Sequence, residues 1–202
     1  MSPSLRRARP HDDAWTSPPT LPMQPIFPVD AVAFWREAGP ELWFAKDETF
    51  DRRFRHRFSD AHDAAASHAL DHWMASAYGS LALILLLDQY PRNAFRGSPR
   101  MYATDEKARR LASTAIELGH DRQGPQDLRL FYYLPFGHSE DLVDQDLSVS
   151  LAHQLGEPYF ARAKHHREIV RRFGRFPHRN AILSRESTAE ELHFLANGGF
   201  AG

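Results

Sequence analysis

One uninterrupted apolar run constrains the fold of this chain more than any other feature. Residues 81–87 read Leu-Ala-Leu-Ile-Leu-Leu-Leu, so every face of the segment is apolar. Leucine and alanine favour a helix over a strand, and a helix that is apolar all round must be surrounded by protein. The run is far shorter than the roughly 20 residues that cross a bilayer, so it predicts a core helix. Pro91 should end that helix at Tyr90, because proline disfavours a helical conformation in the residue before it.

Helical spacing also dominates the rest of the sequence. Phe50, Phe54 and Phe58 recur every four residues, which predicts an aromatic stripe on the buried face of a second helix. Start and stop signals elsewhere predict about eight helices and no β-hairpin. These signals are caps at Asp30, Asp47, Thr104 or Asp105, and Ser139, a capping box within Ser187–Glu191, and stops at Gly39-Pro40, Gly119, Gly156 and Gly174. The predicted fold class is all-α, with the helices packed as helical hairpins.

The length and composition set limits on organisation and chemistry. A chain of 202 residues suits one domain around a single core. Residues 1–28 are rich in proline and serine, which predicts a flexible tail and leaves residues 29–202 for the helical domain. No apolar segment follows the arginines near the N-terminus, so we expect no secretory signal and a cytoplasmic protein. Cysteine is absent, which excludes disulfides, thiolate catalysis and cysteine-based zinc sites.

Three polar segments interrupt the helical pattern. The first, residues 88–93, reads Asp-Gln-Tyr-Pro-Arg-Asn and follows the apolar run directly. The second, residues 135–141, reads Pro-Phe-Gly-His-Ser-Glu-Asp, and the third, residues 173–180, reads Phe-Gly-Arg-Phe-Pro-His-Arg-Asn. Charged and amide groups beside proline and glycine at helix ends need partners, either from the protein or from a ligand. These segments are therefore the best candidates for a functional site.

The same segments carry a resemblance to a known family. Their residues and order resemble the bacterial family of unknown function called DUF924, over roughly Val29 to Phe200. Other matching positions are Phe34-Trp35, Trp43-Phe44, and Ser187-Thr188 with Glu190 or Glu191. The resemblance implies an all-helical architecture similar to the tetratricopeptide-like superfamily, and it implies no activity. The chain departs from the family pattern at Ser184, where glycine is usual, and at Gly137, where a larger residue is usual.

Asp88 predicts that distant segments meet. At the expected C-terminal end of the apolar helix its carboxylate would face the negative end of the helix dipole, so it needs a cation. That cation would be Arg92 or an arginine of the third segment. Guanidinium groups also suit carboxylate or phosphate ligands, so the sequence predicts an anion pocket. The predicted binding residues are Arg92, Asn93, Arg175, His178, Arg179 and Asn180. Alternatively, the arginines are structural and pair with nearby acids.

His138 is the candidate for proton transfer. Neighbouring carboxylates would raise the pKa of its imidazole toward neutrality and let it act as a general acid or base. Glu140 and Asp88 would orient or tune it, which completes the predicted catalytic set of His138, Glu140 and Asp88. In the alternative reading, Ser139 caps a helix and the two acids after it suit the helix N-terminus. That reading leaves His138 unexplained.

Metal ligation is weakly indicated. His68 and His72 are four residues apart on an expected helix, as in some zinc sites, but no third ligand has a matching spacing. The His62-Asp63 pair lies outside the polar segments, and His165-His166 lies among basic residues and suggests a solvated face. We therefore assign no metal ligand, and the sequence specifies no cofactor.

Three functions remain as hypotheses. The favoured one is a pocket for a small anionic ligand, and whether it is catalytic is left open. The alternative is a tetratricopeptide-like interaction scaffold that holds a peptide, in which the polar segments are structural. Nucleic-acid binding through residues 162–179 is disfavoured, because the formal net charge of −1 provides no global basic field. No membrane association is expected, and the oligomeric state is left open.

Overall fold

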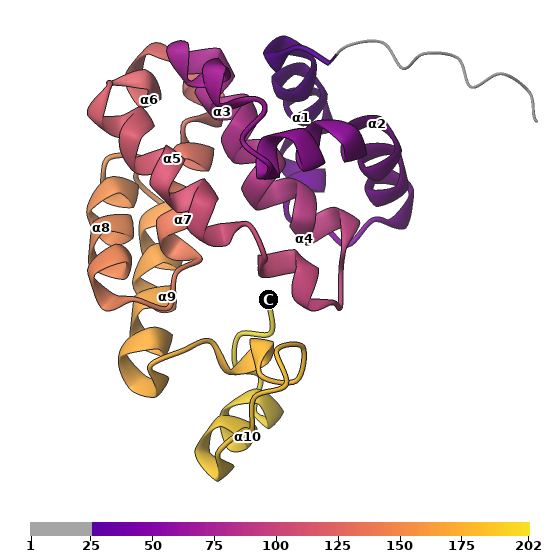
Figure 1. Ribbon diagram of the computed structural model, residues 1–202. Coiled ribbons are helices and arrows are strands. Elements are labelled where there is room, and N and C mark those ends of the chain that lie inside the picture. Colours follow the sequence, from indigo (N-terminus) through magenta and orange to yellow (C-terminus); the bar gives the residue numbers. More distant parts are fainter. Residues whose placement is uncertain (1–25) are drawn as a thin grey trace, which may run out of the picture.

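The computed structural model describes residues 26–202, so most of the predicted tail lies outside the described residues. Within that range every regular element is helical, which confirms the all-α class (Figure 1). The α-helices are α1 (Pro28–Trp43), α2 (Glu48–Ala66), α3 (Ala77–Ile84), α4 (Tyr90–Ala94), α5 (Asp105–Glu117), α6 (His120–Gln123), α7 (Leu130–Gly137), α8 (Leu142–His153), α9 (Tyr159–Phe173) and α10 (Ala189–Ala196). The 3₁₀ turns are η1 (Asp71–Ala75), η3 (Pro99–Tyr102), η4 (Gln126–Leu128) and η5 (Pro177–Arg179), and a π-helical turn, η2 (Leu85–Gln89), joins α3 to α4.

The predicted core helix lies at the centre of the molecule. Helix α3 contacts α1, α5, α6 and α7, and residues 81–87 are almost completely inaccessible to solvent. The aromatic stripe of α2 packs against α1, with the Phe54 ring centroid 5.2 Å from that of Phe34 and 5.5 Å from that of Trp35. Both predictions for the core are therefore confirmed. Among the described helices, none is long and apolar enough to cross a membrane.

Most predicted helix boundaries are found at the signals that predicted them. Asp47 caps α2 by accepting a hydrogen bond from the Phe50 amide at 2.7 Å, and Thr188 and Glu191 form the capping box of α10. The kink in α1 at Gly39 and the end of α9 at Gly174 both have left-handed backbone, with φ of 73° and 68°. Ser139, in contrast, does not cap α8, because Asp141 holds that position.

The helix does not end before Pro91, so that prediction was wrong. In η2 the Tyr90 amide donates to the Leu85 carbonyl, a bond that spans five residues instead of four. Pro91 then falls in the first turn of α4, where its missing N–H group removes no helical hydrogen bond. The chain stays helical through Ala94. Asp88 consequently lies inside a continuous helical segment, and its need for a cation comes from burial rather than from a helix end.

A second, smaller apolar cluster holds the C-terminal part of the chain. Buried Ile169, Val170 and Phe176 form its centre, and partly buried phenylalanines at 173, 194 and 200 pack around them. Helix α10 lies beyond the end of α9, apart from the helices of the main core (Figure 1). The third polar segment links α9 to this cluster and so places the C-terminal segment opposite α4 and α7.

Replacing Ser184 by glycine should stabilise the protein. Ser184 has a φ of 54°, in the left-handed region where a side chain costs roughly 1–2 kcal/mol. Glycine removes this cost but adds freedom to the unfolded chain, so we expect Ser184→Gly to raise the free energy of unfolding by about 0.5–1 kcal/mol. Urea denaturation measures this change in the free energy of unfolding. Ser150→Gly, the same change on the exposed face of α8, should lose about 0.5 kcal/mol. A loss of stability at both positions would contradict the strain at Ser184.

Candidate functional site

A cleft of about 370 Å³ lies between the helical body and the C-terminal segment. Its basic side chains come from four parts of the chain and are Arg92, Arg96, Arg162, Arg179, His138, His166 and His178. Aromatic rings form much of the remaining wall, namely Trp43, Phe44, Tyr102, Phe176 and Phe200. No aspartate or glutamate of the described residues lines it. The cleft therefore presents cations and imidazoles on an aromatic background.

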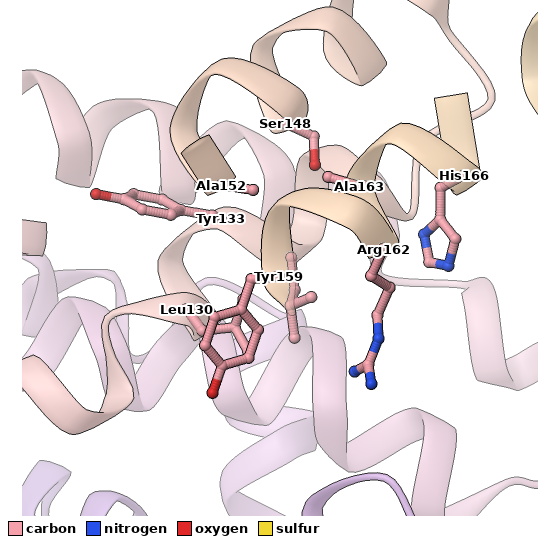
Figure 2. A pocket seen from close by; sticks show the side chains of 10 residues that line it. Leu130, Tyr133, Ser148, Ala152, Tyr159, Arg162, Ala163 and His166 are labelled. Atoms are coloured by element: carbon pink, nitrogen blue, oxygen red, sulfur yellow. The ribbon is translucent and has the colours of Figure 1, made fainter. Parts of the chain in front are cut away.

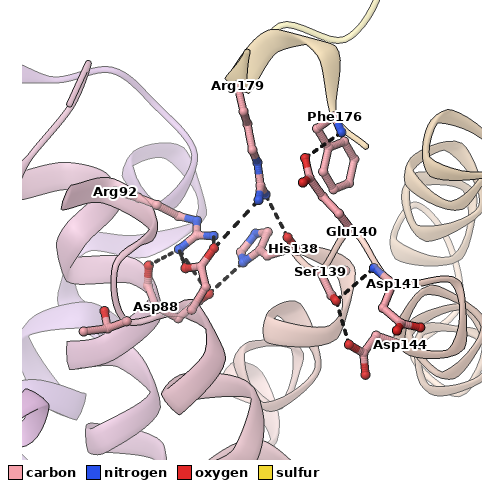
Figure 3. A network of polar contacts seen from close by, with 12 residues as sticks. Asp88, Arg92, His138, Ser139, Glu140, Asp141, Asp144, Phe176 and Arg179 are labelled. Atoms are coloured by element: carbon pink, nitrogen blue, oxygen red, sulfur yellow. Dashed lines mark hydrogen bonds and ion pairs between the residues drawn. The ribbon is translucent and has the colours of Figure 1, made fainter. Parts of the chain in front are cut away.

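Asp88 and His138 form a close pair at one wall of the cleft. Nδ1 of His138 lies 2.7 Å from Oδ1 of Asp88, whose side chain is 1% exposed (Figure 3). The π-helical turn places Asp88 on this side of the core, and the end of α7 places His138 opposite it. His138 lines the cleft, and its Nε2 atom has no hydrogen-bond partner among residues 26–202. The pair therefore has a buried acid behind an imidazole that faces the cleft.

Arg92 connects this pair to α5. Its guanidinium binds both carboxylate oxygens of Asp105, at 2.7 and 2.9 Å, and lies 3.2 Å from Oδ1 of Asp88. Arg179 of η5 donates a hydrogen bond of 2.8 Å to the His138 carbonyl and lies 3.9 Å from Asp105. The first and third polar segments thus come together at Asp105, but the cation that Asp88 binds is Arg92 of its own segment and not an arginine of the third. The two acids lie behind the arginines, so the cationic groups face the cleft.

This arrangement sets the protonation states. Burial by itself would raise the pKa of Asp88, but Arg92 and His138 outweigh it and lower that pKa to about 2. Burial and Arg92 also lower the pKa of His138, although Asp88 opposes them. The predicted rise of the His138 pKa was therefore wrong, because burial and the charge of Arg92 together outweigh the effect of the Asp88 carboxylate. At neutral pH the imidazole is neutral, its Nδ1–H donates to Asp88, and Nε2 carries a free lone pair.

Three buried nitrogen atoms around the cleft have no hydrogen-bond partner among residues 26–202. They are Nε of Arg179, Nδ1 of His178 and Nε2 of His166, all on side chains that line the cleft. Buried donors and acceptors are nearly always hydrogen bonded in folded proteins. Burial and Arg92 also lower the pKa of Arg179, so its charge is held at an energetic cost. An anion in the cleft would offset that cost and supply a missing acceptor.

Three of the predicted site residues lie outside the cleft. Glu140 accepts a hydrogen bond from the Phe176 amide at 2.8 Å and two from Arg185, at 2.6 and 2.9 Å. Arg175 binds Glu191 at 2.6 and 2.8 Å, and Asn180 donates to the same carboxylate at 3.2 Å. These three residues hold the C-terminal segment in place. Of the other predicted residues, Arg92, Asn93, His138, His178 and Arg179 line the cleft and Asp88 lies behind it.

Three basic residues of the cleft were missed by sequence reasoning. Arg96 binds Asp51 and the Asn93 side chain, and Arg162 lies over the Phe44 ring at 4.9 Å. His166 is 9% exposed and packs on Phe200, which corrects its reading as part of a solvated face. The spacing of Arg162 and His166, four residues apart in α9, places both on one helix face and was the available signal.

The histidine pairs suggested for metal binding have other surroundings. His68 lies 2.8 Å from Asp71, and His62 is buried, hydrogen bonded to the Leu86 carbonyl and stacked on Tyr90. Over residues 26–202, no three histidine or acidic side chains are arranged to hold a metal ion.

Comparison with known proteins gives a family. The model of the family described as "Bacterial protein of unknown function (DUF924)" matches residues 31–199. The chain belongs to the DUF924 family. The chain is also similar to a solved structure, the protein of unknown function ATU0120 from Agrobacterium tumefaciens, with 54% identity and a TM-score of 0.83. The match covers 85% of this chain and 97% of that one. No curated protein matches.

His166 should make the protein less stable in mild acid. Burial, followed by the neighbouring His138, lowers the pKa of His166 to about 3, so between pH 6.5 and 3 only the unfolded state is protonated at this residue. Stability therefore falls as the pH falls, by on the order of 2 kcal/mol for this group between pH 7 and 5. Urea denaturation at the two pH values measures the difference.

The variant His166→Phe tests whether the effect belongs to this residue. Phenylalanine suits the contacts with Phe176 and Phe200 and cannot bind a proton, so the loss between pH 7 and 5 should shrink. The matched change at an exposed histidine, His193→Phe, should leave the loss as in the wild type. An undiminished loss in His166→Phe would rule out this residue as the source.

Proposed function

We propose that this protein binds a small anion in the cleft and that His138, oriented by Asp88, acts there as a general base. The observation that carries the proposal is the sorting of charge, with arginine and histidine side chains lining the cleft and acids behind them. Here Arg162 lines the cleft and makes no ion pair with a described carboxylate.

The anion would lie beside Arg179 and His138. Nε of Arg179 is buried and unpaired, while its Nη2 atom is already bound to the His138 carbonyl. Both Arg92 and Arg179 lie over the Tyr102 ring, with guanidinium carbons 5.9 and 4.6 Å from its centroid. Three of the five N–H donors of Arg92 bind the Asp105 carboxylate and the Asp88 carbonyl, so Arg92 contributes mainly charge, whereas Arg179 contributes charge and a hydrogen bond from its buried Nε.

The chemistry that fits the pair is proton removal. A neutral imidazole whose Nδ1–H is held by a carboxylate has a basic Nε2 atom, and this is how a general base is oriented. No serine or threonine of the described residues lines the cleft. The proton would therefore come from the bound anion or from a water molecule beside it.

The scaffold alternative receives support at the residues outside the cleft. Glu140, Arg175 and Asn180 tie the C-terminal segment to the body and to α10, as the structural reading of the polar segments proposes. A tetratricopeptide-like scaffold would use those ties without any ligand in the cleft. The two functions differ in whether an anion stabilises the protein.

Inorganic phosphate should bind in the cleft, and the loss of a cleft arginine should lower the affinity for phosphate. A ligand at 100 times its dissociation constant adds about 2.7 kcal/mol of stability, so thermal unfolding with phosphate or succinate should show a raised Tm. Arg162→Ala should keep the Tm of the free protein, because this side chain is exposed and pairs with no described acid, and should weaken binding about threefold. Arg179→Gln should weaken it roughly tenfold or more, since it removes a charged hydrogen bond.

The matched control is Arg171→Ala on the same helix as Arg162. Arg171 is exposed, pairs with Glu168 and lies outside the cleft, so its loss should leave the phosphate affinity unchanged. Titration of His138 by NMR locates the anion, because phosphate beside the imidazole should raise its pKa. If neither phosphate nor succinate raised the Tm, or all three arginine variants responded alike, the scaffold would become the better proposal.

A further inference from the structure

A second, smaller cavity adjoins the cleft between α7, α8 and α9 (Figure 2). Its volume is about 30 Å³, which holds about two water-sized groups. Most of its wall is apolar, formed by side chains of Leu130, Leu134, Ala152, Tyr159 and Ala163. A space of this kind suits a short hydrocarbon group better than a polar one.

The two cavities share a boundary. Leu134 and Gly137 of α7 and Arg162 and His166 of α9 line both of them. Gly137 directly precedes His138, and consecutive Cα atoms are about 3.8 Å apart. The entrance of the side cavity is therefore one residue away from the imidazole that faces the cleft.

Gly137 keeps this boundary open. A Cβ atom at position 137 would lie 3.0 Å from Oγ of Ser148 and 3.9 Å from Nδ1 of His166. Gly137 is helical and is not among the residues with a positive φ, so the backbone does not require glycine there. The missing side chain instead lets Ser148 of α8 lie close to α7 and leaves the space beside it, toward His166, uncrowded.

The polar atoms at the boundary are also unsatisfied. Ser148 is 5% exposed, and its hydroxyl has no hydrogen-bond partner in the part of the chain that the structure describes. Nε2 of His166 is buried and unpaired. A boundary used only for packing between helices would be expected to satisfy these groups or to replace them by apolar ones.

We infer that the ligand is an anion with a short, unbranched alkyl chain, and that Gly137 sets the chain length by admitting the chain to the side cavity. This inference rests on the proposed anion site. The charged head would lie at Arg179 and His138, and the chain would pass Gly137 to reach the alanines of α8 and α9. Gly137 is then a specificity-determining residue that contacts the ligand through its α-carbon.

The test is calorimetric titration of a homologous series. Inorganic, methyl, ethyl, propyl and butyl phosphate share one head group, and acetate to valerate provides the same chains on a carboxylate. We expect the affinity of the wild type to rise by roughly threefold to fourfold for each methylene that is buried, and then to level off once the cavity is full. The head group that binds more tightly identifies the anion.

Variants of the boundary separate this inference from the proposed function. Gly137→Ala should flatten the dependence on chain length, measured as the ratio of the affinities of the same variant for butyl phosphate and for inorganic phosphate. Because its Cβ would crowd Ser148, the double variant Gly137→Ala with Ser148→Ala provides the same blocked passage without that contact. Ser148→Ala alone enlarges the cavity, so the affinity of this variant should still rise with chain length.

Each outcome decides one proposal. If neither inorganic phosphate nor acetate binds the wild type, the proposed function fails, and the inference fails with it. If the anions bind but chain length has no effect, the side cavity takes no part, and the proposed anion site stands. If the chain-length effect persists in the double variant, Gly137 does not set the length.

Discussion

The burial of one carboxylate organises the polar part of this molecule. Asp88 is 1% exposed and lies in the π-helical turn that follows the central apolar helix, where burial makes an ionised group unstable unless it is paired. Gln89 and Arg92 of the same segment surround it, together with His138 from the end of α7. Arg92 in turn binds Asp105 at the start of α5. The need to neutralise one acid thus joins the core helix to α5 and to the end of α7.

A second set of ion pairs has a different role. Glu140 joins the start of α8 to Arg185 and to the Phe176 amide, and Arg175 joins the third polar segment to Glu191 of α10. These pairs fix the C-terminal segment against the body, which closes one side of the cleft. Their partners satisfy one another, whereas Arg179, His178 and His166 of the cleft each keep a buried nitrogen atom with no partner among residues 26–202.

Features that depend on neighbouring residues could be predicted from the sequence. Caps at Asp47 and Thr188, the phenylalanine stripe and the glycine stop at Gly174 all depend on neighbouring residues, and all are found. The pairing of Asp88 with Arg92 of its own segment followed from the electrostatic need of a buried acid. In contrast, the burial of His166 and the arrival of Arg162 at the cleft depend on which face α9 turns toward α7. The spacing of these two residues shows that they share a helix face, but packing between distant helices determines where that face points.

The π-helical turn gives the site a property of its own. It places one more residue between Leu85 and Tyr90 than an ordinary helical turn holds. In a regular α-helix each residue is rotated by about 100° from the last, so loss of a single residue from η2 would turn either the leucines before it or the polar residues after it away from their present positions. Packing of the leucines in the core would retain the first group and displace the second. A one-residue deletion in η2 would therefore keep the helical core and remove the polar residues from the cleft.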